Sequence, residues 1–152
     1  MEKGNILILD DEEFVLKALA RELASDAYEI FEARDVRSAL KILSEEPVDV
    51  VISDLHLPGV LGGSFLRIVK DHYPHIVRII LTGYPDTDSA VRAINEEDVF
   101  RYFSKPWRRE ELVNALGQAM KIRNSESERQ KVINGIIENV ERLKSLQTGL
   151  NK

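Results

Sequence analysis

Residues 48–59 have the sequence VDVVISDLHLPG, in which a short apolar run ends on a carboxylate. The run at 50–52 consists of β-branched residues, which is typical of a strand that is covered on both faces. The Pro-Gly pair at 58–59 ends whatever element begins there. Asp54 therefore stands at the carboxyl end of a predicted buried strand. Because open parallel α/β sheets bind ligands beyond this end of their strands, Asp54 is a candidate for a functional site.

Strands and helices alternate along residues 6–123. Alternation of this kind predicts a parallel sheet with helices on both faces and right-handed crossovers. Five strands fit the flavodoxin-like order 2-1-3-4-5, so the predicted fold is a doubly wound α/β sheet followed by a C-terminal helix. The predicted strands are 6–9, 28–33, 50–53, 77–81 and 99–104; the predicted helices are 11–25, 36–45, one that carries Phe65 and ends near Tyr73, 86–95, and one that starts near Arg108. The apolar residues of the first helix are Phe14, Val15, Ala18, Leu19 and Leu23.

The composition limits the kinds of protein that this chain can be. With 152 residues, 43% of them hydrophobic and 31% charged, the chain is long enough for one globular domain with a core. A formal net charge of −5 provides no positive field, so direct binding to nucleic acid is not expected. The chain has no cysteine, which excludes disulfides and thiolate ligands. The polar start is followed by only four apolar residues, too few for a signal peptide or a membrane span, and a cytoplasmic protein is therefore expected.

Polar residues also follow other strands of the predicted sheet. Asp10 and Asp11 come directly after the first strand, which the predicted order places beside the strand that ends at Asp54. Thr82 and Lys105 follow the fourth and fifth strands. Because the carboxyl ends of parallel strands meet at one edge of the sheet, we expect the three carboxylates to converge there, flanked by the threonine and the lysine.

This combination of side chains indicates a particular chemistry. Three carboxylates in one pocket repel one another, and proteins tolerate this by protonating one of them or by binding a cation. Oxygen ligands favour a hard divalent ion such as Mg²⁺, which takes a phosphate as a further ligand. An ammonium and a hydroxyl can bind the other oxygens of a phosphoryl group while a carboxylate attacks its phosphorus. The sequence therefore predicts phosphoryl transfer to Asp54.

Short motifs stand at the strand ends in a fixed order. They are Asp10-Asp11, Asp54 followed by Pro58 and Gly62, Thr82-Gly83, and Tyr102-x2-Lys105-Pro106. With these motifs, residues 1–123 resemble the receiver domain of two-component response regulators. The resemblance implies that Asp54 accepts a phosphoryl group from a sensor histidine kinase and that the chain catalyses only its own phosphorylation and dephosphorylation. The implied ligands of Mg²⁺ or Mn²⁺ are Asp10, Asp11, Asp54 and the backbone carbonyl of His56.

The resemblance also implies a switch that is driven by phosphorylation. A phosphoryl group adds about −1.5 to −2 charges and three acceptor oxygens. Thr82 and Lys105 contact these oxygens, and the ring of Tyr102 turns into the space that opens. The face formed by the helix at 86–95, the strand at 99–104 and the last helix is then remodelled as a population shift. From the residues alone, Tyr102 can also be read as an ordinary core side chain.

Three bulky side chains lie close to these motifs in the sequence. His56 stands two positions after Asp54, and Tyr84 stands two positions after Thr82. Both would border the path of a hydrolytic water, so we expect them to slow the loss of the phosphoryl group. Trp107 is expected to anchor the last helix by packing.

Residues 124–152 form a helical extension of the predicted receiver domain at 1–123. Apolar side chains of the extension follow a 3-4 spacing that traces back into the last helix, so one long helix is expected. An apolar stripe on an isolated helix needs a partner, which favours a parallel homodimeric coiled coil through the last helix and the extension. The alternative is a helical hairpin or a frayed end, since Gly135 and Gly149 weaken helix propensity. The stripe consists of Ile133, Ile136, Val140, Leu143 and Leu150, with Gln147 as an interruption.

Two other functions compete with the signalling module. A haloacid-dehalogenase-like phosphatase also combines an aspartate nucleophile with a threonine and a lysine. That family needs Asp-x-Asp at its nucleophile, where this chain has His56, and it places its metal-binding acids late in the chain rather than at Asp10 and Asp11. A receiver-fold adaptor that only dimerises would carry a vestigial site, and the full set of five site residues argues against it.

Overall fold

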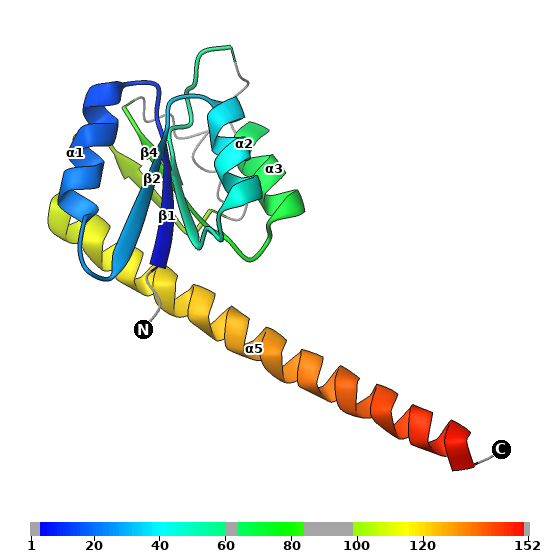
Figure 1. Cartoon of the computed structure of the whole chain (residues 1–152). Coiled ribbons are helices and arrows are strands. Elements are labelled where there is room, and N and C mark those ends of the chain that lie inside the picture. Colours follow the sequence, from blue (N-terminus) through cyan, green and yellow to red (C-terminus); the bar gives the residue numbers. More distant parts are fainter. Residues whose placement is uncertain (1–3, 60–63, 84–98, 151–152) are drawn as a thin grey trace.

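The computed structural model describes residues 4–59, 64–83 and 99–150, and it contains a sheet flanked by helices (Figure 1). The helix predicted at 86–95 lies outside the described residues, as do Gly62 and Tyr84. In chain order the elements are β1 (Gly4–Leu9), α1 (Glu13–Leu23), β2 (Tyr28–Ala33), α2 (Val36–Glu45), β3 (Val50–Ser53), α3 (Ser64–His72), β4 (Val77–Thr82), β5 (Arg101–Ser104) and α5 (Arg109–Leu150).

The five strands of the sheet are all parallel, in the order β2-β1-β3-β4-β5, which confirms the predicted flavodoxin-like fold. The register of neighbouring strands decides which residues meet at the carboxyl edge. Leu9, the last residue of β1, lies opposite Ser53, the last residue of β3. The N–H of Asp54 donates a hydrogen bond of 2.9 Å to the carbonyl of Leu9. Asp10 and Asp54 therefore leave the sheet side by side.

The sheet separates two apolar cores, because successive side chains of a strand point to opposite faces. Leu7 and Leu9 of β1 belong to the core shared with α2 and α3, whereas Ile6 and Ile8 belong to the core shared with α1 and the first turns of α5. These four side chains are at most 1% exposed. Figure 1 shows α1 and the start of α5 on one side of the sheet and α2 and α3 on the other. Close packing on both faces fixes the position of the carboxyl edge.

The structure departs from the apolar pattern of the sequence at two places. Phe14 is 80% exposed although it was grouped with the apolar residues of α1, whereas Leu16 is 2% exposed. Successive helical residues are turned by about 100° around the axis, so Phe14 faces away from Leu16 and Leu19. The last strand is also shorter and less buried than the run at 99–104 suggests. Because β5 is the edge of the sheet, both of its end residues are exposed.

Helix α5 is a continuous helix of 42 residues, which confirms the predicted long helix and not the hairpin alternative. Leu112 and Leu116 in its first turns are fully buried against the sheet. Further along, Nε of Arg123 forms an ion pair of 3.3 Å with Oδ1 of Asp49. Beyond this point α5 projects away from the sheet (Figure 1). Among the described residues, no helix combines the length and the apolar character that crossing a membrane would require.

Candidate functional site

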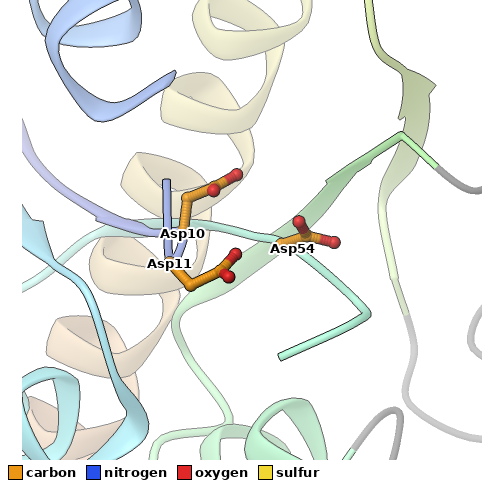
Figure 2. Close-up of side chains that lie close together, drawn as sticks. All are labelled: Asp10, Asp11 and Asp54. Carbon is orange, nitrogen blue, oxygen red and sulfur yellow. The ribbon is translucent and has the colours of Figure 1, made fainter. Parts of the chain in front are cut away.

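Three carboxylates gather at the carboxyl edge of the sheet, where the strand order predicts them. Asp10 and Asp11 follow β1, Asp54 follows β3, and one carboxylate oxygen from each lies within 4.8 Å of the others. Figure 2 shows Asp10 and Asp11 extending toward Asp54 from the neighbouring segment. Asp10 and Asp54 are buried, with 2% and 7% exposure, and Asp11 is half-buried. Asp11 is therefore the most accessible of the three.

Backbone N–H groups orient two of these carboxylates. The N–H of Glu12 donates to Oδ1 of Asp10 over 2.9 Å, and the N–H of His56 donates to Oδ1 of Asp54 over 3.0 Å. Each bond reaches the residue two positions further on, a local turn that aspartate favours. The second oxygen of each carboxylate then contacts Lys105. The side chain of His56 is exposed, as expected for a loop residue.

The ammonium of Lys105 lies between two of the carboxylates. Its Nζ is 2.6 Å from Oδ2 of Asp10 and 3.0 Å from Oδ2 of Asp54. Burial disfavours the charge of Lys105, but the hydrogen bonds to Asp10 and Asp54 outweigh this effect and raise the pKa of the ammonium. Burial also raises the pKa of Asp10, and the ammonium that it shares with Asp54 compensates only in part. The ammonium of Lys105 therefore offsets only part of the cost of burying Asp10 in its charged form.

The set of donors suits a hard divalent cation. Asp10, Asp11, Asp54 and Lys105 together carry a charge of −2 when all are ionised. Carboxylate oxygens that lie within 4.8 Å of one another repel each other by at least about 3 kcal/mol per charged pair at an effective dielectric constant of 20. A second cation would relieve this repulsion, and carboxylate oxygens are ligands that Mg²⁺ and Mn²⁺ prefer. The residues at this edge therefore fit such an ion.

Thr82 and Tyr102 come from β4 and β5. Thr82, which is fully buried, ends β4 opposite Ser104, and its carbonyl accepts a hydrogen bond of 2.8 Å from the N–H of Lys105. Tyr102 lies further inside the sheet, opposite Ile80, and its half-buried side chain packs against the core shared with α2 and α3. The structure thus brings Thr82 to the edge that holds the carboxylates and places Tyr102 two residues before the end of β5.

Two contacts that tie the last part of the chain to the rest of the domain do not appear in the sequence analysis. Trp107, which was expected only to pack, donates its indole N–H to Oε2 of Glu22 over 2.5 Å. Arg123 pairs with Asp49 at the opposite end of β3. The partners of the first contact are 85 residues apart in the chain. No local pattern links them, because helical periodicity reports which face of a helix is apolar and not which side chain another segment will meet.

A doubly wound parallel sheet that gathers carboxylates and a lysine at its carboxyl edge places the chain among the α/β proteins whose ligand sites lie beyond the ends of the strands. The chain belongs to the response regulator receiver domain family, whose model matches residues 6–117. It is therefore a receiver domain, a signalling module of the kind found in two-component systems.

Individual relatives agree with this assignment. The chain is 31% identical over 119 residues to the hydrogenase transcriptional regulatory protein HoxA of Cupriavidus necator. The matched stretch covers 78% of this chain and 24% of the relative. It is 26% identical to the response regulator protein PilR of Pseudomonas aeruginosa over 152 residues, which are 100% of this chain and 34% of the relative. The chain thus spans about a quarter to a third of the length of these curated relatives.

A solved structure gives the same picture. The signal receiver domain of an HD domain-containing protein from Pseudomonas fluorescens is 40% identical to this chain, with a TM-score of 0.78. The match covers 82% of this chain and 99% of that domain. The part of this chain that the solved domain leaves uncovered corresponds in size to the projecting end of α5.

Proposed function

We propose that this receiver domain is a phosphoacceptor in a two-component phosphorelay and that Asp54 carries the phosphoryl group. The position of Asp54 supports this most: it is a buried carboxylate at a strand end, 3.0 Å from the ammonium of Lys105 and beside two further carboxylates. Phosphoryl transfer to a carboxylate needs a nucleophile, a cation and acidic metal ligands, and all three are provided here. The proposed donor is a sensor histidine kinase.

The chemical step forms a bond between Asp54 and phosphorus. A carboxylate oxygen of Asp54 attacks the phosphorus of a phosphohistidine. The P–O bond forms as the P–N bond breaks, and the departing imidazole nitrogen keeps the electron pair and takes up a proton from solvent. Asp10, Asp11, Asp54 and the backbone carbonyl of His56 would hold Mg²⁺ or Mn²⁺, which supplies charge neutralisation for the phosphoryl oxygens. Lys105 then exchanges one of its carboxylate contacts for a phosphoryl oxygen.

The switch that follows uses the residues at the ends of β4 and β5. The hydroxyl of Thr82 binds a second phosphoryl oxygen, and the ring of Tyr102 turns toward the space beside it. This movement shifts the population of the face that includes β5 and α5 toward its active state. His56 and Tyr84 border the path of a hydrolytic water and slow the loss of the phosphoryl group.

The proposed division of the chain is a receiver domain at 1–123 and a helical extension at 124–152. The projecting end of α5 carries seven large hydrophobic side chains with 42–65% exposure. A second copy of the chain is the partner we propose for this surface, in a parallel coiled coil. The seven exposed hydrophobic side chains of the projecting end are Val132, Ile133, Ile136, Ile137, Val140, Leu143 and Leu146.

Phosphorylation by a small donor tests the proposed function directly. The full chain is incubated with acetyl phosphate and Mg²⁺, and its intact mass is followed. We expect the mass to rise by one phosphoryl group and to return to the original value after the donor is removed, because an aspartyl phosphate is hydrolysed. A chain that gains no phosphoryl group from acetyl phosphate or from a phosphohistidine donor would contradict the proposal.

Metal binding is expected to change stability, and Asp11→Asn is the variant that shows it. Without metal, this substitution should raise the free energy of unfolding by about 1–3 kcal/mol, because it removes one of three mutually repelling charges. With Mg²⁺ at 100 times its dissociation constant, the unmodified chain should gain about 2.7 kcal/mol. Asp11→Asn should lose most of this gain, because it lacks one ligand.

Urea unfolding in chelator and in Mg²⁺ measures both effects. The matched control is Asp71→Asn, which removes an exposed charge of α3. This control should respond to Mg²⁺ like the unmodified chain. An equal response of Asp11→Asn and the control would show that Asp11 does not bind the metal.

A further inference from the structure

Trp107 is the only tryptophan of the chain, and it lies between β5 and α5, two residues after Lys105. Its half-buried ring packs against the core shared with α1 and α5. Its indole N–H donates to Oε2 of Glu22, in the last turn of α1. A hydrogen bond to a carboxylate is charge-assisted and is therefore stronger than one between neutral groups. Packing alone would not require this partner.

The hydrogen bond between Trp107 and Glu22 is the second of two links between the segment at 105–107 and α1. Lys105 contacts Asp10, and the carboxylate of Asp10 also accepts a hydrogen bond from the N–H of Glu12, the residue directly before α1. Trp107 contacts Glu22 at the other end of the same helix, which is about 16 Å long. Two residues of one segment therefore hold the two ends of α1.

This connection bears on the position of the Lys105 ammonium. The backbone of Lys105 is held on its strand side by the hydrogen bond to Thr82. After Lys105 in the chain, the next residue that forms a described hydrogen bond with another helix or strand is Trp107, whose partner is Glu22 of α1. The lysine side chain is long and flexible, so its placement within 3.0 Å of two carboxylates depends on where this segment lies.

We propose that Glu22 and Trp107 are positioning residues for Lys105. Their hydrogen bond holds the segment after β5 at a distance from α1 that places the ammonium between Asp10 and Asp54. The coupling is reciprocal: a change in the contacts of Lys105 moves the indole relative to Glu22. This inference rests on the proposed function for its effect on phosphorylation, but the coupling itself exists without any phosphoryl group.

Phosphorylation rates with acetyl phosphate test the positioning role. Trp107→Phe keeps a ring in the core and removes the N–H donor, and Glu22→Ala removes the acceptor. Both should lower the initial rate about 10- to 100-fold, since a misplacement on the order of 1 Å has effects of this size. Glu22→Gln, which keeps an acceptor oxygen, should restore most of the rate. Calorimetry should show unchanged Mg²⁺ affinity, because the three carboxylates are intact.

Two comparisons separate this role from simple loss of stability. Glu32→Gln removes the carboxylate of β2 that pairs with Lys17 of α1 at 3.4 Å, without touching the segment after β5, and should leave the rate unchanged. In a Lys105→Met background, Trp107→Phe should cause no further loss, because the residue that it positions is gone. A loss of the same size in both backgrounds, or no loss in the unmodified chain, would overturn the proposal.

The indole N–H resonance tests the coupling even if the chain cannot be phosphorylated. Asp54→Asn changes a contact of Lys105 and should shift this single NMR signal, whereas the same substitution in a Lys105→Met background should not. If the chemical shift of the indole N–H is unchanged by Asp54→Asn, the proposed coupling is wrong. Failure of phosphorylation in the unmodified chain would instead contradict the proposed function alone.

Discussion

Replacing Asp54 with asparagine is expected to abolish phosphate incorporation, with a loss of at least about 1,000-fold. An amide has no ionised oxygen with which to attack phosphorus. The fold should persist, because the asparagine oxygen can still accept the N–H of His56, which now lies 3.0 Å from Oδ1. Lys105 also keeps its contact of 2.6 Å with Asp10. Intact-mass spectrometry after incubation with acetyl phosphate and Mg²⁺ measures the effect.

The matched control is Asp35→Asn, the same chemical change at the N-cap of α2. The side chain of Asp35 accepts the N–H of Ser38 over 2.7 Å. Because asparagine caps helices about as well as aspartate does, this variant should incorporate phosphate like the unmodified chain. If Asp54→Asn still gained a phosphoryl group, Asp54 would not be the acceptor. Peptide mapping would then show whether Asp10 or Asp11 takes its place.

The second large effect is expected in the association of the chain. We predict a dimer through the projecting end of α5 and a monomer when Ile136 and Leu143 are both replaced by glutamate. These side chains are 57% and 65% exposed in the single chain and would be buried between two helices. Burying four unpaired carboxylates per dimer is costly, so the dissociation constant should rise by at least about 1,000-fold. Light-scattering mass over a range of concentrations measures the change.

The geometry of α5 explains why this surface is open to a second copy. At about 100° per residue, the stripe around Ile136 and Val140 is turned by roughly a third of a circle from the face that Leu112 and Leu116 bury against the sheet. A second helix can therefore lie along the stripe without meeting the receiver domain of the same chain. In such a dimer, the apolar side chains of the projecting end would contact the second helix instead of water.

A double variant on the other side of the helix is the control for this prediction. Asn134→Glu with Ser145→Glu adds the same number of charges at exposed positions that face away from the stripe. It should remain a dimer. A monomeric unmodified chain would contradict the coiled coil, and a mass above that of two chains would contradict its two-stranded form.

Much of the fold could be predicted because its signals are local. The apolar run at 50–52 identifies a buried strand by itself, and the carboxylate that follows needs only the direction of the strand to be placed at the right edge. The strand order then brings Asp10 to Asp54, which the hydrogen bond from Asp54 to Leu9 shows in detail. Repeated strand-helix alternation constrains the order of a doubly wound sheet, and this is why the prediction extended from elements to topology.

The features that could not be predicted depend on contacts between distant segments. The exposure of Phe14 is one example, because an apolar residue can extend a helical pattern without facing the core. The bond between Trp107 and Glu22 is another, since its partners lie 85 residues apart. The sharing of one ammonium by Asp10 and Asp54 is a third, because the length and flexibility of the Lys105 side chain allow several partners.

The ion pair between Arg123 and Asp49 gives α5 a mechanical consequence. This pair ties the helix to the residue directly before β3, and the 27 residues that follow Arg123, up to Leu150, continue without a break. At a rise of 1.5 Å per residue they form a lever about 40 Å long. A tilt of about 5° at the ion pair would therefore displace the far end by roughly 3–4 Å, so a movement too small to disturb the core of the receiver is enlarged to the width of a side chain.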